Sequence, residues 1–158
     1  MMNEHIAIVG AGLIGRAWAI VFARAGCSVA IYDALPEALA GCEKLLHENI
    51  SDLAQHGLIK EAPAVVLARI TPVATLAEAL QGAALVQENV RETIEAKRAI
   101  FAEMDALAAP DTILASSTSW LMASEFSEDL PGRHRIMVGH PVNPPYLVPL
   151  VELAPAPW

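Results

Sequence analysis

The fold of this chain is decided by the stretch IAIVGAGLIG, residues 6–15. Its first four residues are apolar and mostly β-branched, which is typical of a buried parallel strand. Gly10, Gly12 and Gly15 then form the pattern G-x-G-x-x-G, which opens an apolar segment, Leu13–Ala25, with the character of a helix. Strand, glycine-rich turn and helix in this order predict the first unit of a Rossmann-type fold.

The glycines and the helix they open have the chemistry of a phosphate-binding loop. Gly10 permits a tight turn, Gly12 lets the backbone approach a pyrophosphate, and Gly15 lets helix and strand pack closely. The first turn of the helix, at Leu13 and Ile14, offers free N–H groups and the positive end of the helix dipole to phosphates. We therefore expect these five residues to bind a dinucleotide.

Asp33 indicates which dinucleotide is bound. It follows a second expected strand, Ser28–Tyr32, and stands 18 residues after Gly15. A carboxylate there can accept hydrogen bonds from the adenosine ribose hydroxyls and would repel a 2′-phosphate, so NAD is favoured over NADP. Two alternatives stay open. The glycines could be turn residues only, with Asp33 capping the next helix, or the cofactor could be FAD, which uses a similar fingerprint.

The rest of the chain alternates between strand-like and helix-like segments. This pattern predicts an α/β fold, a doubly wound Rossmann-type domain with a mostly parallel sheet. Further strands are expected at Ile70–Val73, Ala84–Gln87, Thr112–Ala115, Arg135–Val138 and Val148–Leu153. Further helices are expected from Pro36 towards Gly57 and at Glu61–Ala68, Leu76–Leu80 and Glu92–Leu107.

Size and composition limit the class of protein. A chain of 158 residues suits one domain, and 54% hydrophobic with 18% charged residues indicates a compact soluble protein. The net charge of −8 argues against nucleic acid and anionic membranes as partners. The N-terminus lacks a basic region and a long apolar run, so we expect no signal peptide and a cytoplasmic location. Cys27 and Cys42 are expected at core positions, and no His or Cys spacing predicts a metal site.

The segment HPVNPP, residues 140–145, has the features of a catalytic element. His140 is followed by Asn143 and, 12 residues on, by Glu152, with prolines stiffening the turn between them. An imidazole held beside a carboxylate is suited to act as a general base. The other histidines lack such neighbours, and we expect them to be solvated.

A hydroxyl-rich loop, Ser116–Ser119, follows the expected strand Thr112–Ala115. Loops at the carboxyl ends of parallel strands line the ligand crevice, so these hydroxyls can contact a nicotinamide or a substrate oxygen. The alternative is a cluster of capping or turn residues. A hydrolase using Ser119 and His140 is disfavoured, because the chain has no G-x-S-x-G elbow.

On these two motifs the chain resembles the NAD-binding domain of the 3-hydroxyacyl-CoA dehydrogenase family, which includes L-gulonate 3-dehydrogenase (lambda-crystallin) and carnitine dehydrogenase. ASSTS at 115–119 is similar to the family's serine loop, and HPVNP at 140–144 to its His-x-x-Asn-Pro element. The resemblance implies that His140 is the general base, Glu152 its orienting partner and Ser119 a contact to the reacting oxygen. It places Asn143 at the nicotinamide side.

The resemblance also places Glu92 and Lys97 at cofactor-contacting positions. From the charge pattern alone, both would belong to a solvated helical face. Ser117 and Trp120 depart from the acyl-CoA enzymes, which usually have Asn and Ser there, and the segment after His140 is closer to the gulonate-type branch.

The family is expected to oxidise the 3-hydroxy group of a small-molecule substrate, either a 3-hydroxyacyl-CoA or a 3-hydroxy acid such as L-gulonate. In the family a helical C-terminal domain follows and supplies substrate walls and a homodimer interface. We expect this chain, residues 1–158, to end before that domain and before the last strand of its own, and to be inactive alone. The alternative is a non-catalytic NAD-binding or structural protein.

Overall fold

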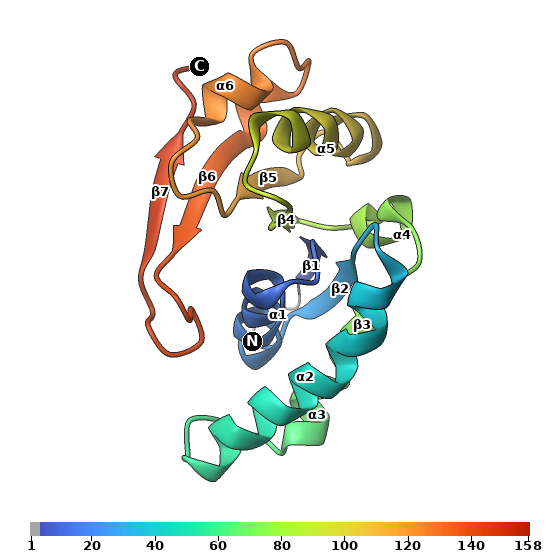
Figure 1. Cartoon of the computed structure of the whole chain (residues 1–158), viewed down its shortest axis with the longest axis vertical. Coiled ribbons are helices and arrows are strands. Elements are labelled where there is room, and N and C mark those ends of the chain that lie inside the picture. Colours follow the sequence, from blue (N-terminus) through green and yellow to red (C-terminus); the bar gives the residue numbers. More distant parts are fainter. Residues whose placement is uncertain (1–3) are drawn as a thin grey trace.

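The computed structural model describes residues 4–158, which form one sheet with helices on both faces (Figure 1). The structure contains a strand at or near each position where the sequence predicts one. In chain order the strands are β1 (His5–Val9), β2 (Ser28–Tyr32), β3 (Ile70–Pro72), β4 (Leu85–Glu88), β5 (Ile113–Ser116), β6 (Ile136–Pro141) and β7 (Val151–Pro155).

The helices alternate with the strands over most of the chain. They are α1 (Leu13–Arg24), α2 (Pro36–Gln55), α3 (Pro63–Leu67), α4 (Leu76–Leu80), α5 (Ile94–Leu107) and α6 (Ala123–Ser127), with a short 3₁₀ turn at Arg133–Arg135. Among the described residues no helix combines the length and the apolar character needed to cross a bilayer.

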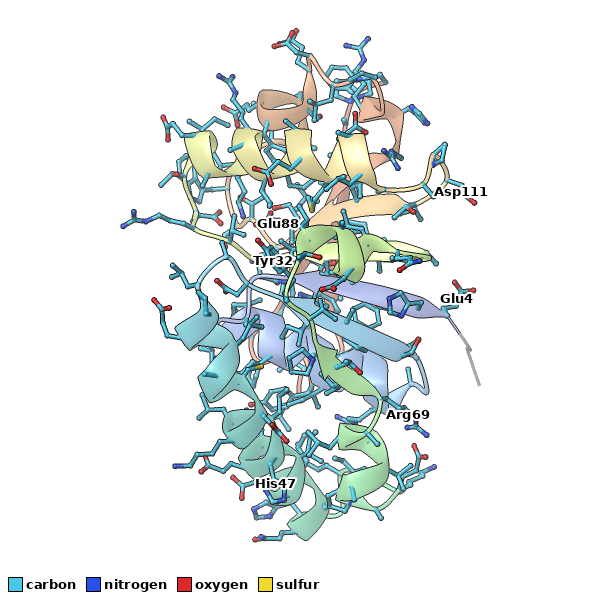
Figure 2. All side chains as sticks on the ribbon, turned by 90° about the vertical axis from the view of Figure 1, so that its right-hand side faces the viewer. Glu4, Tyr32, His47, Arg69, Glu88 and Asp111 are labelled. Atoms are coloured by element: carbon cyan, nitrogen blue, oxygen red, sulfur yellow. The ribbon has the colours of Figure 1, made fainter. Side chains whose placement is uncertain are left out.

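The strand order is β3-β2-β1-β4-β5-β6-β7, with β1 to β6 parallel and β7 antiparallel to β6. This is the doubly wound Rossmann order with one antiparallel edge strand, so the expected fold class is confirmed. Figure 2 shows the common strand direction: Glu4, Arg69 and Asp111, which each precede a strand, lie opposite Tyr32 and Glu88, which each end one. The order reverses between β1 and β4, where open α/β sheets bind ligands.

The sheet buries a core on each face because successive side chains of a strand point to opposite sides. Ile6 and Ile8 of β1 pack in one core with Trp18 of α1 and with α2 and α3. Ala7 and Val9 pack in the other core with α4, α5 and α6. Cys27 and Cys42, expected in the core, are buried free thiols in the first of these cores.

Several expected boundaries are corrected by the structure. The helix expected at Glu92–Leu107 begins at Ile94, because the Thr93 side chain accepts the Ala96 N–H and caps it. The helix α6 was not predicted from the sequence. The strand expected at Val148–Leu153 is displaced to β7, whose residues pair with the end of β6.

The strand β6 is longer than the expected Arg135–Val138 and includes His140. The histidine therefore lies in a ladder and not on a loop. Pairing with β7 extends β6 beyond the point where its pairing with β5 ends, at Ser116 and Val138.

Candidate functional site

The glycine-rich loop joins β1 to α1, and each glycine has a distinct environment. Gly10 has φ +99°, and a Cβ there would lie 2.7 Å from the Asn89 carbonyl oxygen. A Cβ on Gly15 would lie 1.8 Å from the Gly10 carbonyl oxygen. Gly12 differs, because a Cβ there would meet no atom within 4 Å. Protein packing thus explains Gly10 and Gly15, while Gly12 leaves open backbone at the helix N-terminus, which fits a phosphate-bearing cofactor.

A cleft of about 490 Å³ opens beside this loop at the reversal point of the sheet. Gly10, Gly12, Asp33, Asn89 and Arg91 are among the residues that line it. The cleft therefore lies where Asp33 and the glycine loop would hold the adenosine half of a dinucleotide.

Asp33 braces the glycine loop. Its Oδ2 accepts the Ala11 N–H at 2.7 Å and its Oδ1 accepts the Leu35 N–H at 2.9 Å. The alternative that Asp33 caps α2 is wrong, because the N-cap residue of α2 is Leu35 and no side chain caps it. Each carboxylate oxygen keeps a second lone pair, so Asp33 can still accept hydrogen bonds from ribose hydroxyls.

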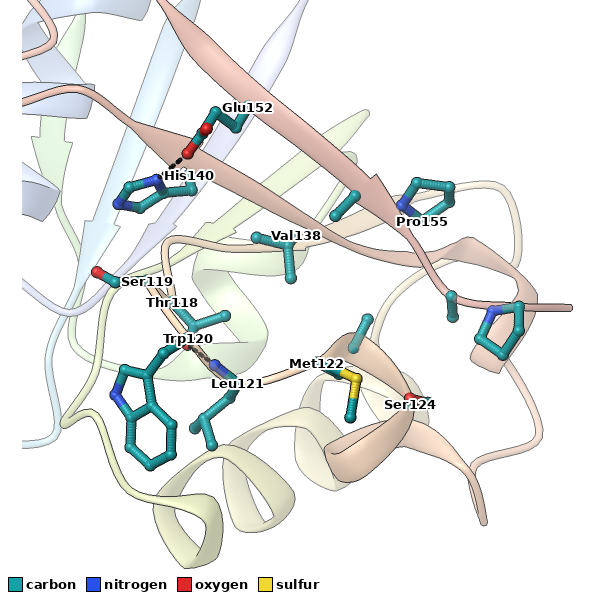
Figure 3. A pocket seen from close by; sticks show the side chains of 14 residues that line it. Thr118, Ser119, Trp120, Leu121, Met122, Ser124, Val138, His140, Glu152 and Pro155 are labelled. Atoms are coloured by element: carbon teal, nitrogen blue, oxygen red, sulfur yellow. Dashed lines mark hydrogen bonds and ion pairs between the residues drawn. The ribbon is translucent and has the colours of Figure 1, made fainter.

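His140 and Glu152 are directly opposite each other in the β6–β7 ladder. Opposite residues of an antiparallel pair project to the same face, so the register brings the two side chains together. The His140 Nδ1 lies 2.8 Å from Glu152 Oε2 (Figure 3). The His140 side chain is 25% exposed and that of Glu152 is 71% exposed. The pair is therefore formed within the folded chain and is open to a ligand.

The serine loop lies beside this pair. Ser119 and Trp120 are exposed, and they line a cavity of about 570 Å³ together with Met122, His140 and Glu152. Figure 3 shows this arrangement, with the serine loop and the His140–Glu152 pair on the same side of the cavity. The structure thus brings the three residues expected to be catalytic to one cavity. Asn143 is exposed on the connection from β6 to β7.

Glu92 anchors the serine loop. Its Oε1 accepts the Thr118 hydroxyl at 2.5 Å and the Ser119 N–H at 2.8 Å. Its Oε2 lies 3.6 Å from the Lys97 Nζ. Burial alone would raise the pKa of the Glu92 carboxyl, but the hydrogen bonds from Thr118 and Ser119 and the Lys97 ammonium hold it below its usual range. Glu92 therefore stays ionised and fixes the loop.

Lys97 is buried, so the solvated-face alternative is wrong for this residue. Its side chain is 1% exposed, and its Nζ lies 2.8 and 2.9 Å from the two oxygens of Glu88, which is fully buried. Glu88 Oε2 also accepts the Ser116 hydroxyl at 2.6 Å, and Oε1 accepts the Val90 N–H. Burial raises the pKa of the Glu88 carboxyl, and Lys97 and the two donors oppose that rise.

Glu88 was missed from the sequence, although it carried a signal. Gln87, Glu88 and Asn89 form a polar run at the carboxyl end of a buried strand, where ligand sites of α/β folds lie. For Lys97 the signal was the helical period, since it shares a stripe of α5 with Ile94 and Phe101.

A cleft at the reversal point of a doubly wound sheet, kept open by a glycine-rich loop, defines a Rossmann dinucleotide-binding domain. The profile described as "3-hydroxyacyl-CoA dehydrogenase, NAD binding domain" matches residues 5–158. The chain belongs to this family, whose cofactor is NAD.

Known proteins similar to this chain include dehydrogenases and crystallins. Lambda-crystallin of Oryctolagus cuniculus is 39% identical over 154 residues, covering 96% of this chain and 48% of its own. L-carnitine dehydrogenase of Streptomyces griseus is 38% identical and covers 95% of this chain and 44% of its own. The crystal structure of 3-hydroxybutyryl-CoA dehydrogenase from Escherichia coli K12 matches with a TM-score of 0.89 at 28% identity. The match covers 99% of this chain and 34% of that chain. The chain spans about half the length of the curated relatives it matches.

Proposed function

We propose that this chain is the cofactor-binding part of an NAD-dependent dehydrogenase that oxidises a 3-hydroxy group to a ketone, with His140 as the general base. The observation that supports this most directly is the His140–Glu152 contact of 2.8 Å, made across a ladder at the edge of the cavity that Ser119 also lines. Such a pair at an open cavity favours a catalytic protein over a structural one.

Glu152 decides which nitrogen of His140 does the chemistry. An ionised carboxylate only accepts hydrogen bonds, so the Nδ1 beside it carries the proton and Nε2 keeps its lone pair. Nε2 takes the proton of the substrate hydroxyl, and Glu152 stabilises the imidazolium that results. A positioned base of this kind contributes about 10²–10⁴-fold to the rate.

Ser119 donates its hydroxyl hydrogen bond to the reacting oxygen of the substrate, and Glu92 fixes the loop that carries it. When bound, NAD⁺ supplies the hydride acceptor. Gly12, Leu13 and Ile14 present backbone N–H groups to its phosphates, and Asp33 accepts hydrogen bonds from its adenosine ribose. Asn143 contacts the nicotinamide side. Glu92 contacts the cofactor, and the buried Lys97, predicted at a cofactor-contacting position, supports Glu92 from beneath.

The substrate is a 3-hydroxy acid such as L-gulonate or a 3-hydroxyacyl-CoA. The names of the relatives support a hydroxy acid or its CoA ester, since they include L-carnitine and 3-hydroxybutyryl-CoA dehydrogenases. We further propose that the whole protein is a cytoplasmic homodimer and that turnover requires the length beyond this chain.

Calorimetric titration of the purified chain with NADH tests the cofactor assignment. We expect saturable binding, with NADPH binding more weakly because Asp33 repels the 2′-phosphate. An absence of NADH binding at millimolar concentration would contradict it.

The base is tested by His140→Ala in the full-length protein, assayed with L-gulonate, L-carnitine and 3-hydroxybutyryl-CoA. NADH affinity should be retained while turnover falls by about 10²–10⁴-fold. Full turnover in this variant would remove His140 from the mechanism.

A further inference from the structure

A partly buried polar cluster lies between the two halves of the site. We define the Ser117 node as the side chains of Trp18, Gln87, Asn89 and Ser117. The Ser117 Oγ accepts the Trp18 indole N–H at 3.0 Å and a Gln87 amide N–H at 2.7 Å, and it lies 2.7 Å from Asn89 Oδ1. Trp18 is 5% exposed and Gln87 is 3% exposed. Polar groups this deep are stable only when they are paired, so the node is a specific arrangement.

The directions of these hydrogen bonds are fixed. A hydroxyl has one donor and two acceptor sites, and two N–H groups occupy both acceptor sites of Ser117. The Ser117 hydrogen must therefore point to Asn89 Oδ1. The Asn89 Nδ2 group then donates to the backbone carbonyl oxygen of Gln87 at 2.8 Å. Each member thus orients the next, and loss of the Ser117 hydroxyl would leave two buried donors unpaired.

The node connects the parts of the site that must act together. The second N–H of Gln87 donates to the Gly139 carbonyl oxygen at 3.0 Å, directly before His140. The backbone ladder between β5 and β6 ends at Ser116 and Val138. One residue further along each strand, the Gln87 amide group of β4 donates to both Ser117 and Gly139, so it joins β5 to β6 where their backbone pairing has stopped. The Asn89 backbone carbonyl lies beside Gly10 of the glycine loop, and Ser117 lies two residues before Ser119.

We propose that the Ser117 node positions the nicotinamide half of NAD against the serine loop and the strand that carries His140. This inference rests on the proposed function. Trp18, Gln87, Asn89 and Ser117 act as positioning residues, because they hold the backbone around the reacting groups. The carboxylate that would bind the adenosine ribose lies apart from the node: Asp33 follows β2, on the other side of β1 from β4, β5 and β6. Asn89 is the one node residue that also lines the cleft beside Asp33, so the test uses the other node residues, Ser117 and Trp18.

This separation gives a test with two ligands. NADH reaches both halves of the site, whereas ADP-ribose carries the adenosine half and both riboses without the nicotinamide. In Ser117→Ala, measured by calorimetry on the chain, we expect NADH affinity to fall by roughly fivefold to fiftyfold, while ADP-ribose affinity stays within about twofold of wild type. The fluorescence enhancement of bound NADH should also fall, since it reports the nicotinamide environment.

Two further variants support the comparison. Trp18→Phe removes one donor and keeps the aromatic stacking on Phe22, so it should weaken NADH by roughly twofold to tenfold and spare ADP-ribose. Ser127→Ala is the matched control, because it removes a buried hydroxyl that donates to the Ala123 carbonyl oxygen in α6, away from the node. It should leave both affinities unchanged.

The outcomes separate the node from the proposed function. A wild-type chain that binds neither ligand would overturn the cofactor assignment and the node together. A wild-type chain that binds both, with Ser117→Ala and Trp18→Phe losing both ligands equally or losing neither, would overturn the node alone. Should Ser117→Ala fail to fold, Trp18→Phe still decides between these results.

Discussion

Replacing Lys97 with methionine tests the buried ion pair beneath the serine loop. Methionine keeps the unbranched shape and most of the length of the side chain and removes its charge. Glu88 is then left fully buried with two donors, the Ser116 hydroxyl and the Val90 N–H, in place of three. The surrounding core is closely packed, so water cannot replace the ammonium without displacing side chains.

The expected cost follows from this uncompensated charge. Removing one partner of a buried ion pair typically destabilises a protein by about 3–5 kcal/mol. For a domain of this size, that corresponds to a fall in melting temperature of roughly 6–20 °C. The exposed Lys44, whose side chain is 81% exposed beside Glu48, provides the control, and Lys44→Met should leave the melting temperature unchanged.

The pH dependence gives the sign of the effect. With Lys97 gone, only the hydrogen bonds from Ser116 and Val90 oppose the rise that burial causes in the pKa of Glu88, so that pKa rises further and protonation of Glu88 on folding is favoured. A carboxyl with a raised folded-state pKa destabilises the fold increasingly as pH rises above its unfolded value of 4.5. The deficit of the variant relative to wild type should therefore be small near pH 4.5 and larger at pH 8.

Urea unfolding at both pH values gives the free energies, and thermal melts give the melting temperatures, each monitored by circular dichroism. The double variant Glu88→Gln with Lys97→Met removes both charges, and its loss should be smaller than the sum of the two single losses. A Lys97→Met protein within about 1 kcal/mol of wild type at pH 8, or strictly additive losses, would refute the buried ion pair as described.

Three further predictions concern other parts of the molecule. Gly12→Ala should keep the melting temperature and lower the affinity for NADH. Gly15→Ala should lower both the melting temperature and the affinity, since its Cβ would lie 1.8 Å from the Gly10 carbonyl oxygen. Thermal melts measure the first quantity and calorimetry the second. The lowered pKa of Glu92 contributes stability that is complete above about pH 4.5 and is lost as pH falls through the folded value, so acid should release the serine loop, seen as exchange of its amides. Burial raises the pKa of the Cys42 thiol to about 11, so it should resist thiol reagents at pH 8 until the protein unfolds.

The sequence predicted the fold because its signals are local. The strand, the glycine turn and the helix at residues 6–25 occur in one continuous segment, and the alternation that follows admits few topologies. Asp33 could be placed beside the glycine loop for the same reason, because its distance from that loop is set by one helix and one strand. Boundaries such as the start of β7 depend on the partner strand, so the local pattern did not determine them.

The site was predicted where residues act through motifs and missed where they act through burial. His140 and Glu152 were paired correctly from their spacing and the resemblance. Lys97 was ambiguous, because a charged residue on a helix is usually solvated and only its partner, Glu88 from another strand, makes its burial favourable. Gln87 joins residues that lie 30 and 52 positions away, and such long-range contacts leave no periodic signal.

The antiparallel edge strand makes the length of a connecting segment part of the chemistry. Residues 142–150 join β6 to β7 and thereby set which residue of β7 faces His140. Because side chains alternate between faces, a slip of one residue in this pairing would turn the Glu152 carboxylate to the other side of the sheet. Insertions and deletions in residues 142–150 are therefore tolerated only when the turn absorbs them outside the ladder. Under the proposed function, a change in loop length that shifts this pairing would lower activity as much as the loss of His140.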